Sequence, residues 1–276
     1  MNYLITGGAG FIGSNMASFL IKKGHNVIVL DNLSTGKKIF INELLKEENF
    51  KFILCDLLNK DLLNSVFENH IDFVYHFAAN ADVRFGLNQP GKDLEQNTIA
   101  TYNLLEAMRV NKVKKIAFSS TGSVYGETNV FPTPEDAPFP IQTSLYGASK
   151  LACEALISAY CEGFGFQGYI YRFVSILGQH YTHGHVYDFT KSLIENPNKL
   201  NVLGNGLQQK SYLNIFDCVR AMYLIEGSSN KKICIYNLAT PELINVNQSI
   251  KFISKLMKVN PKISYGKEDR GWVGDN

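Results

Sequence analysis

A tyrosine and a lysine lie four residues apart, at Tyr146 and Lys150, in a stretch that predicts a helix over residues 146–163. Residues at this spacing share one helical face, so the phenol and the ammonium lie one turn from each other. A neighbouring positive charge favours phenolate, which can act as a general base near neutral pH. Thr121, in a hydroxyl-rich run after a predicted strand, can hydrogen-bond the same substrate oxygen. The three residues predict proton abstraction from a hydroxyl group.

Three glycines near the N-terminus are spaced to bind a dinucleotide. Gly7, Gly10 and Gly13 form G-x-x-G-x-x-G between a predicted strand and a predicted helix. Glycine permits the tight turn and the close approach of a pyrophosphate, and the helix N-terminus offers N–H groups to phosphates. Asp31 ends the second predicted strand, 18 residues after Gly13, where a carboxylate meets ribose hydroxyls. Because a carboxylate repels a 2′-phosphate, this spacing favours NAD over NADP.

The elements that must position these residues alternate between strands and helices. Short apolar runs followed by Gly, Asn or Ser predict strands at residues 2–6, 26–31, 51–55, 72–77 and 114–119. Apolar residues at helical spacing predict helices at residues 11–24, 93–110 and 146–163. This alternation predicts an α/β fold with a doubly wound parallel Rossmann sheet, whose strand ends face the ligand crevice.

The pattern loosens after residue 175, which predicts a smaller, substrate-binding lobe. We expect an NAD-binding domain over residues 1–174 and mainly this lobe over residues 175–276, with the two interleaved. The elements expected in the lobe lie at residues 201–203, 217–226, 233–238 and 246–259.

Three histidines, His180, His183 and His185, cluster at the start of this second part. They are compatible with a metal site, with contacts from a substrate loop, or with ordinary loop positions. Because the cluster has no nearby acidic or Cys ligands, we expect no metal.

The composition excludes several classes of protein. The 276 residues contain 27 Lys+Arg and 25 Asp+Glu, so there is no basic excess typical of nucleic-acid binding. No apolar run approaches the roughly 18 residues of a membrane span, and the N-terminus does not resemble a signal peptide. The five cysteines are scattered and form no C-x-x-C, which indicates reduced thiols in a cytoplasmic protein.

Five segments, in this order, resemble the motifs of one enzyme family: TGGAGFIG, DNLSTG, HFAANADV, STGSVYGE and YGASK. The combination is similar to extended short-chain dehydrogenases/reductases that act on nucleotide sugars, above all UDP-glucose 4-epimerases and their relatives. It implies NAD as cofactor, a nucleotide-diphosphate sugar as substrate, and Thr121, Tyr146 and Lys150 as catalytic residues.

The resemblance also implies which residues contact NAD. They belong to the glycine turn, to the ends of the predicted strands at residues 26–31, 51–55 and 72–77 and the segments that follow them, and to the two predicted helices at residues 93–110 and 146–163. The expected contacts are Gly7, Gly10, Phe11, Ile12, Gly13, Asp31, Asn32, Ser34, Gly36, Asp56, Leu57, Phe77, Ala78, Ala79, Asn97, Tyr146 and Lys150.

Two departures from the family pattern bear on the reaction. Gly122 and Ser123 lie where sugar-dehydrating members carry an Asp-Glu pair, and neither residue can transfer the protons for water loss. This argues against 4,6-dehydratase activity. Ser175 replaces the Asn that contacts the substrate in epimerases, which leaves the identity of the sugar open.

On the substrate side, the resemblance implies two cations near the diphosphate. Lys210 takes the place of a usual Arg, and Arg270 precedes a Gly-Asp pair near the C-terminus. The expected substrate contacts are Thr121, Ser123, Tyr146, Ser175, Lys210 and Arg270.

These residues predict oxidation at C4 of the sugar. Tyr146 removes the 4-hydroxyl proton with help from Thr121, C4 passes its hydride to NAD, and Lys150 holds the nicotinamide ribose and lowers the pKa of the tyrosine. A 4-epimerase then returns the hydride to the opposite face. The alternative is a C4 dehydrogenase, for example of a GDP-heptose, that releases the 4-keto product. A non-catalytic NAD-sensing module would lack the three catalytic residues.

By resemblance, we also expect a homodimer or higher homo-oligomer paired through the helices at residues 93–110 and 151–163. Apolar residues at helical spacing allow such an interface and equally allow packing on the sheet. They are Leu151, Ala155, Leu156 and Ala159.

Overall fold

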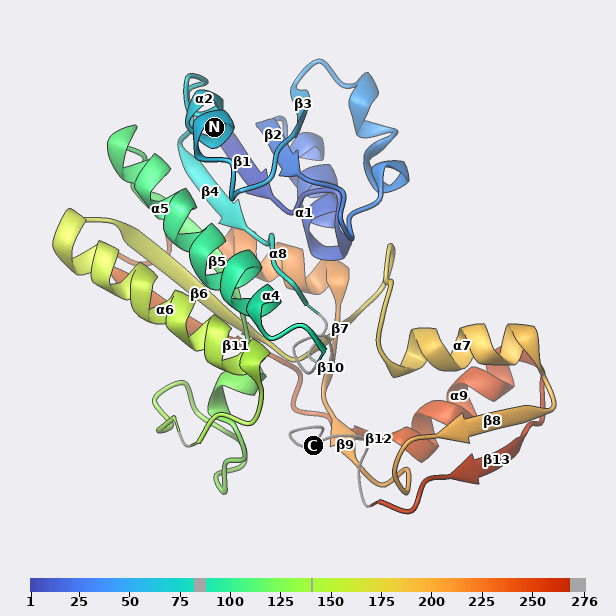
Figure 1. The fold of residues 1–276 in the computed structure, drawn as a ribbon. Helices are drawn as coiled ribbons and strands as arrows, with labels where there is room; N and C mark the ends of the chain where they lie inside the picture. Colours follow the sequence, from blue (N-terminus) through green and yellow to red (C-terminus); the bar gives the residue numbers. More distant parts are fainter. Residues whose placement is uncertain (82–87, 140, 269–276) are drawn as a thin grey trace.

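The computed structural model describes residues 1–81, 88–139 and 141–268. Its centre is a seven-stranded, all-parallel sheet in the order β11-β6-β5-β4-β1-β2-β3 (Figure 1). The strands are β1 (Asn2–Thr6), β2 (Asn26–Asp31), β3 (Phe50–Leu54), β4 (Phe73–His76), β5 (Lys115–Thr121), β6 (Gln167–Phe173) and β11 (Ile233–Leu238). The expected α/β fold with a parallel Rossmann sheet is confirmed.

Helices cover both faces of this sheet, because alternate strand residues are apolar on each side. One core contains Ile5, Val29 and Tyr75 and packs against α1 (Phe11–Lys22) and α8 (Ile215–Ile225). The opposite core packs against α2 (Lys60–Val66), α5 (Ala100–Val110) and α6 (Leu145–Phe164). Strands buried on both faces explain why the strand sequences are apolar almost throughout.

The expected helix over residues 93–110 is interrupted. It comprises α4 (Gly91–Asp93), a π-helical turn (Leu94–Ile99) and α5. The catalytic helix is a single element: Ser144 caps its N-terminus by accepting a hydrogen bond from the Gly147 N–H, and Gly165 ends it with a φ of +67°. Short 3-10 helices lie at Lys38–Ile41, Leu44–Lys46 and Gly122–Tyr125.

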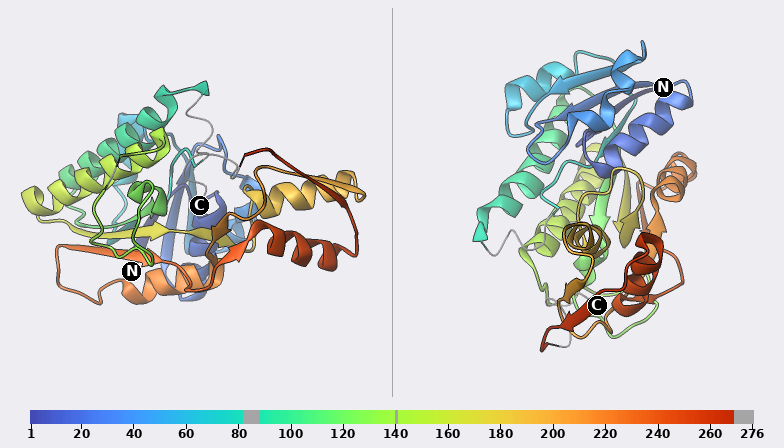
Figure 2. Two further views of the ribbon diagram at one scale, coloured as in Figure 1. Left: turned by 90° about the horizontal axis from the view of Figure 1, so that it is seen from below. Right: turned by 90° about the vertical axis from the view of Figure 1, so that its right-hand side faces the viewer.

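A smaller lobe stands to one side of the sheet (Figure 2). Its core contains Phe189 and Leu193 of α7 (His185–Glu195), Ile250 and Ile253 of α9 (Val246–Met257), and Leu200. Its longer strands, β8 (Lys199–Val202) and β13 (Lys262–Tyr265), pair in parallel. The remaining short strands are β7 (Ser175–Leu177), β9 (Gln209–Lys210), β10 (Tyr212–Asn214) and β12 (Ile244–Asn245).

Two elements that we expected in the smaller lobe belong to the sheet layer instead. The predicted strand at residues 233–238 is β11, which pairs with β6 as an edge of the main sheet. The predicted helix at residues 217–226 is α8, which packs against α1. The chain therefore returns to the sheet layer after β10. Local periodicity predicts an element, whereas its pairing partner is set by long-range packing.

In the parts of the chain that the structure describes, no helix is long and apolar enough to cross a membrane.

Candidate active site

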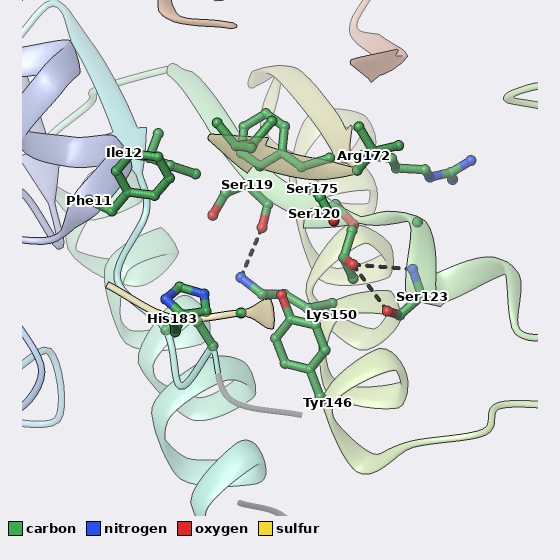
Figure 3. Close-up of a pocket in the computed structure, with 18 of the residues that line it drawn as sticks. Phe11, Ile12, Ser119, Ser120, Ser123, Tyr146, Lys150, Arg172, Ser175 and His183 are labelled. Atoms are coloured by element: carbon green, nitrogen blue, oxygen red, sulfur yellow. Dashed lines mark hydrogen bonds between the residues drawn. The ribbon is translucent and has the colours of Figure 1, made fainter. Parts of the chain in front are cut away.

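One large cavity opens at the carboxyl ends of the sheet strands, between the sheet and the smaller lobe. Its volume is about 1800 Å³, and it is lined from the glycine turn after β1 to the β9 strand of the lobe. Figure 3 shows Phe11 and Ile12 of α1 in the same cavity as Tyr146 and Lys150 of α6. The structure thus brings together residues from all of the segments that the sequence motifs identified.

The glycine turn has the shape that a dinucleotide needs. Gly7 has a φ of +69°, and a Cβ at this position would lie 2.6 Å from the backbone nitrogen of Ala78. A Cβ at Gly13 would lie 2.3 Å from the Gly7 carbonyl oxygen. Gly10 immediately precedes α1 as its N-cap residue, and no side chain caps the N-terminal N–H groups. The first N–H groups of α1 are therefore the backbone donors at the cavity, which fits the phosphates of NAD.

Asp31 is held where a ribose can reach it. The side chain is 8% exposed, and its carboxylate accepts hydrogen bonds from the backbone N–H groups of Ala9 and Leu33, at 2.9 and 2.8 Å. Burial raises the pKa of this carboxyl group. A Cβ on Gly36 would lie 2.6 Å from the Asp31 carboxylate, so the loop closes tightly around it.

Other expected NAD contacts line the same cavity. Asn32 donates a 2.8 Å hydrogen bond to the Asp56 carboxylate, which also accepts the Leu58 N–H. The cavity-lining residues from the remaining expected contacts are Phe11, Ile12, Ser34, Gly36, Leu57, Phe77, Ala78 and Ala79.

Asn97 differs from this expectation. It lies in the π-helical turn, is 1% exposed, and is not among the residues that line the cavity. Its amide oxygen accepts a hydrogen bond from the Asn80 N–H, and its amide nitrogen donates to Ser149 on α6, both at 2.8 Å. The side chain is used to join the segment after β4 to the catalytic helix.

The three candidate catalytic side chains converge from β5 and α6. The Thr121 hydroxyl accepts a hydrogen bond from the Ser123 N–H at 3.1 Å and contacts the Ser123 hydroxyl at 3.2 Å. The Lys150 ammonium donates to the Ser119 carbonyl at 2.8 Å and lies 6.0 Å from the centre of the Tyr146 ring. Tyr146 and Thr121 both line the cavity.

Burial shifts the two titratable groups in opposite directions. It raises the pKa of Tyr146 to about 12, against the lowering effect of the hydrogen bond with Thr121. It lowers the pKa of Lys150 to about 8. We expected Lys150 to lower the pKa of the tyrosine, but in the protein alone desolvation is larger than the effect of any polar neighbour. Burial therefore favours the neutral phenol in the protein alone.

Sequence reasoning missed a buried ion pair beneath these residues. Arg172 on β6 binds both carboxylate oxygens of Glu154 on α6, at 3.0 and 2.7 Å, and both side chains are buried. Glu154 also accepts the hydroxyl of Ser120, the neighbour of Thr121. Arg172 further donates to the Tyr125 hydroxyl at 2.7 Å and to the Glu135 carbonyl at 2.8 Å. The sequence offered one signal for this pair: Glu154 lies one helical turn after Lys150, so its carboxylate is on the same side of the helix as the catalytic residues.

On the substrate side, Ser123, Ser175 and Lys210 line the cavity. Arg270 lies outside the described residues.

The histidines of the 180–185 segment have separate neighbours. His180 stacks on Phe40 with ring centres 4.3 Å apart, and His185 lies 3.2 Å from the Tyr212 hydroxyl. His183 lines the cavity. Among residues 1–81, 88–139 and 141–268, no three His, Cys, Asp or Glu side chains are grouped to hold a metal ion.

The glycine turn, Asp31 and the Thr–Tyr–Lys group in one cavity define an enzyme of the NAD-dependent Rossmann class. The sequence profile of the NAD dependent epimerase/dehydratase family matches residues 3–239, and the chain belongs to this family. It is therefore an enzyme that depends on NAD and is related to nucleotide-sugar epimerases and dehydratases.

Known relatives support this assignment. The UDP-glucuronate 4-epimerase of Thermodesulfobacterium geofontis is 33% identical over 95% of this chain and 83% of its own. The crystal structure of UDP-glucose 4-epimerase with UDP-glucose from Thermotoga maritima is 31% identical, with a TM-score of 0.90 over 99% of this chain and 88% of its own. The UDP-glucuronic acid 4-epimerase of Bacillus cereus, solved with UDP-glucuronic acid and NAD, is 30% identical, with a TM-score of 0.89 over 99% and 88%.

Proposed function

We propose that this enzyme is a UDP-hexose 4-epimerase that works through a 4-keto sugar. The observation that carries the proposal is the placement of Thr121, Tyr146 and Lys150 in the cavity that also contains the glycine turn. The named relatives act on UDP-sugars at C4, which supports the nucleotide and the reacting carbon. They give no support to the GDP-heptose dehydrogenase alternative.

The residues divide the proton chemistry among them. When bound, NAD supplies the hydride acceptor and a positive charge beside the phenol. Tyr146 as phenolate takes the proton of the 4-hydroxyl, and the Thr121 hydroxyl hydrogen-bonds the same oxygen. Lys150, fixed to the Ser119 carbonyl, contributes the second positive charge that favours phenolate. After the keto sugar has turned, the hydride would return to the opposite face of C4 and Tyr146 would give its proton back to the oxygen, which restores the 4-hydroxyl.

Two side-chain positions favour epimerisation over dehydration. Gly122 and Ser123 follow Thr121 in the 3-10 helix, and both line the cavity. Neither side chain is a carboxylic acid, so the acid and base for loss of water are missing at this position. Ser123 instead contacts the Thr121 hydroxyl.

The test is an incubation of the purified chain with UDP-glucose, UDP-galactose, UDP-N-acetylglucosamine and UDP-glucuronate, followed by NMR and by absorbance of reduced nicotinamide. We expect a C4 epimer of one of these sugars and no net reduced cofactor. Tyr146→Phe should lower kcat by about 10²–10⁴-fold. Net reduced cofactor together with a 4-keto product would contradict the proposal and indicate a dehydrogenase.

A further inference from the structure

Residues 178–184 connect β7 to α7 and pass beside α1 on the way (Figure 1). We refer to this segment as the strap. It belongs to the smaller lobe by its connection to α7, yet it makes hydrogen bonds and ring contacts with the cofactor lobe. The Gln179 carbonyl accepts a 2.9 Å hydrogen bond from the Asn15 side chain of α1. The adjacent His180 ring lies 2.9 Å from the Ser14 hydroxyl on the same helix.

His180 is the centre of these contacts. Its backbone has a φ of +69°, a left-handed conformation that non-glycine residues rarely adopt and that the surrounding contacts must hold. The imidazole lies flat on Phe40 of the 3-10 helix Lys38–Ile41, with ring centres 4.3 Å apart and planes 5° apart. The strap is thus fixed to two separate elements of the cofactor lobe.

These contacts lie at the cofactor end of the cavity. Tyr181 meets the Phe11 ring edge-on, with centres 5.5 Å apart, at the first residue of α1. Phe11, Phe40 and Tyr181 all line the cavity. The N-terminus of α1 is the part of the fold that offers N–H groups to a pyrophosphate. The strap therefore crosses the place where the glycine turn holds a dinucleotide.

We propose that the strap retains NAD: the Phe40–His180 stack and the Phe11–Tyr181 contact close the cavity over the dinucleotide and must separate before it leaves. The proposal concerns the cofactor that the whole family uses. It therefore goes beyond the proposed epimerase activity and does not depend on which sugar is bound.

The experiment measures the release of NAD rather than turnover. The purified full chain is loaded with NAD⁺ and desalted, and the released NAD⁺ is trapped by a second dehydrogenase with its own substrate. Phe40→Leu removes the ring and keeps an apolar side chain. His180→Asn also removes the ring, with a residue that tolerates positive φ. Each variant should release NAD about two- to tenfold faster than the unmodified chain, as loss of one aromatic pair implies.

The double variant gives a sharper result. Because both substitutions break one stack, the two effects should not multiply, and the double variant should release NAD about as fast as either single variant. Phe19→Leu is the matched control: Phe19 lies on α1, pairs with Tyr223 and does not line the cavity. Its release rate should equal that of the unmodified chain.

A second measurement separates retention from folding. The melting temperature of the NAD-free protein is compared for Phe40→Leu, His180→Asn and Phe19→Leu. Faster release with similar melting temperatures supports the strap. Release rates for Phe40→Leu and His180→Asn that equal the Phe19→Leu rate would overturn the proposal, whatever the sugar panel shows.

Discussion

Loss of hydration on burial is the largest influence on the pKa values of the two titratable catalytic residues. Tyr146 and Lys150 each lose hydration in the folded chain, and each therefore shifts toward its neutral form, with pKa values of about 12 and about 8. A phenolate at neutral pH then depends on positive charge placed next to it. Lys150 is the charge that the chain itself provides, and its bond to the Ser119 carbonyl fixes its position.

Lys150→Met removes this charge, so the pKa of Tyr146 in the loaded enzyme should rise. We expect the acid limb of kcat/KM against pH to move to higher pH, and kcat/KM at neutral pH to fall about 10²-fold or more. The pH profile is the deciding measurement. Lys191→Met, at an exposed position of α7, is the control. An unshifted acid limb would show that Lys150 does not set the charge of the phenol.

At the scale of the elements, β5, β6 and α6 are joined by a shared buried ion pair. Arg172 and Glu154 meet beneath the site, and Ser120 ties the same carboxylate to the strand that ends in Thr121. The guanidinium also lies near the stacked rings of Tyr125 and Phe139, at 4.8 and 4.9 Å from their centres. The pair thereby fixes the two catalytic elements relative to each other.

Glu154→Gln should leave the buried guanidinium without its counter-charge. We expect the free energy of unfolding to fall by about 3–5 kcal/mol in urea titrations, as for other buried pairs that lose one partner. The matched control is Glu162→Gln on the same helix, whose partner Lys232 is solvent-exposed. It should change stability by less than about 1 kcal/mol. Equal effects of the two substitutions would mean that the Glu154 pair is not sequestered from water.

At the scale of the whole molecule, a fully buried histidine contributes to how stability depends on pH. His76 lies between the hydroxyls of Thr6 and Thr101, at 2.6 and 2.9 Å, and burial lowers its pKa to about 3. In the unfolded chain its pKa is about 6.5. Between these values the unfolded chain binds a proton that the folded chain does not, so stability falls as the pH drops from 6.5 toward 3.

His76→Gln should remove this contribution, which amounts to about 1.4 kcal/mol per pH unit inside the window. The variant is expected to be less stable at pH 7, because its two hydroxyl partners are disturbed, yet to lose less stability between pH 6.5 and 4. Urea titrations across this range measure the slope. His70→Gln, at an exposed position, is the control and should keep the original slope.

Self-association and a cytoplasmic location stay predictions. The four apolar residues of α6 that we expected at an interface between copies differ in exposure. Leu151 and Leu156 pack inward, whereas Ala155 and Ala159 are exposed. Helices α5 and α6 lie side by side on one face of the molecule (Figure 1). This leaves small side chains on an open helix face, where a second copy can approach closely.

Ala155→Glu places a charge on this face and should convert an oligomer to monomer in size-exclusion chromatography with light scattering. Asn64→Glu, at an exposed position of α2, is the control and should leave the mass unchanged. A mass of one chain for the unmodified protein would contradict the predicted homo-oligomer.

Features that depend on short spacings along the chain could be predicted from the residues alone. Gly7, Gly10 and Gly13 define a turn within seven residues, and Tyr146 and Lys150 share a helical face because the helix repeats every 3.6 residues. Six of the seven strands of the parallel sheet were predicted to within two residues, since buried strands are continuously apolar, whereas β6 (Gln167–Phe173) was not predicted.

Features that depend on residues far apart in the chain became clear only in the folded protein. The return of β11 to the main sheet, the Arg172–Glu154 pair, the use of Asn97 as a link to Ser149, and the His180–Phe40 stack each join separate elements. No periodicity carries such information, because the partner of a buried polar group or an edge strand is selected by how the layers pack. The catalytic and cofactor motifs could therefore be predicted from the sequence, whereas the contacts between distant elements that enclose the cavity could not.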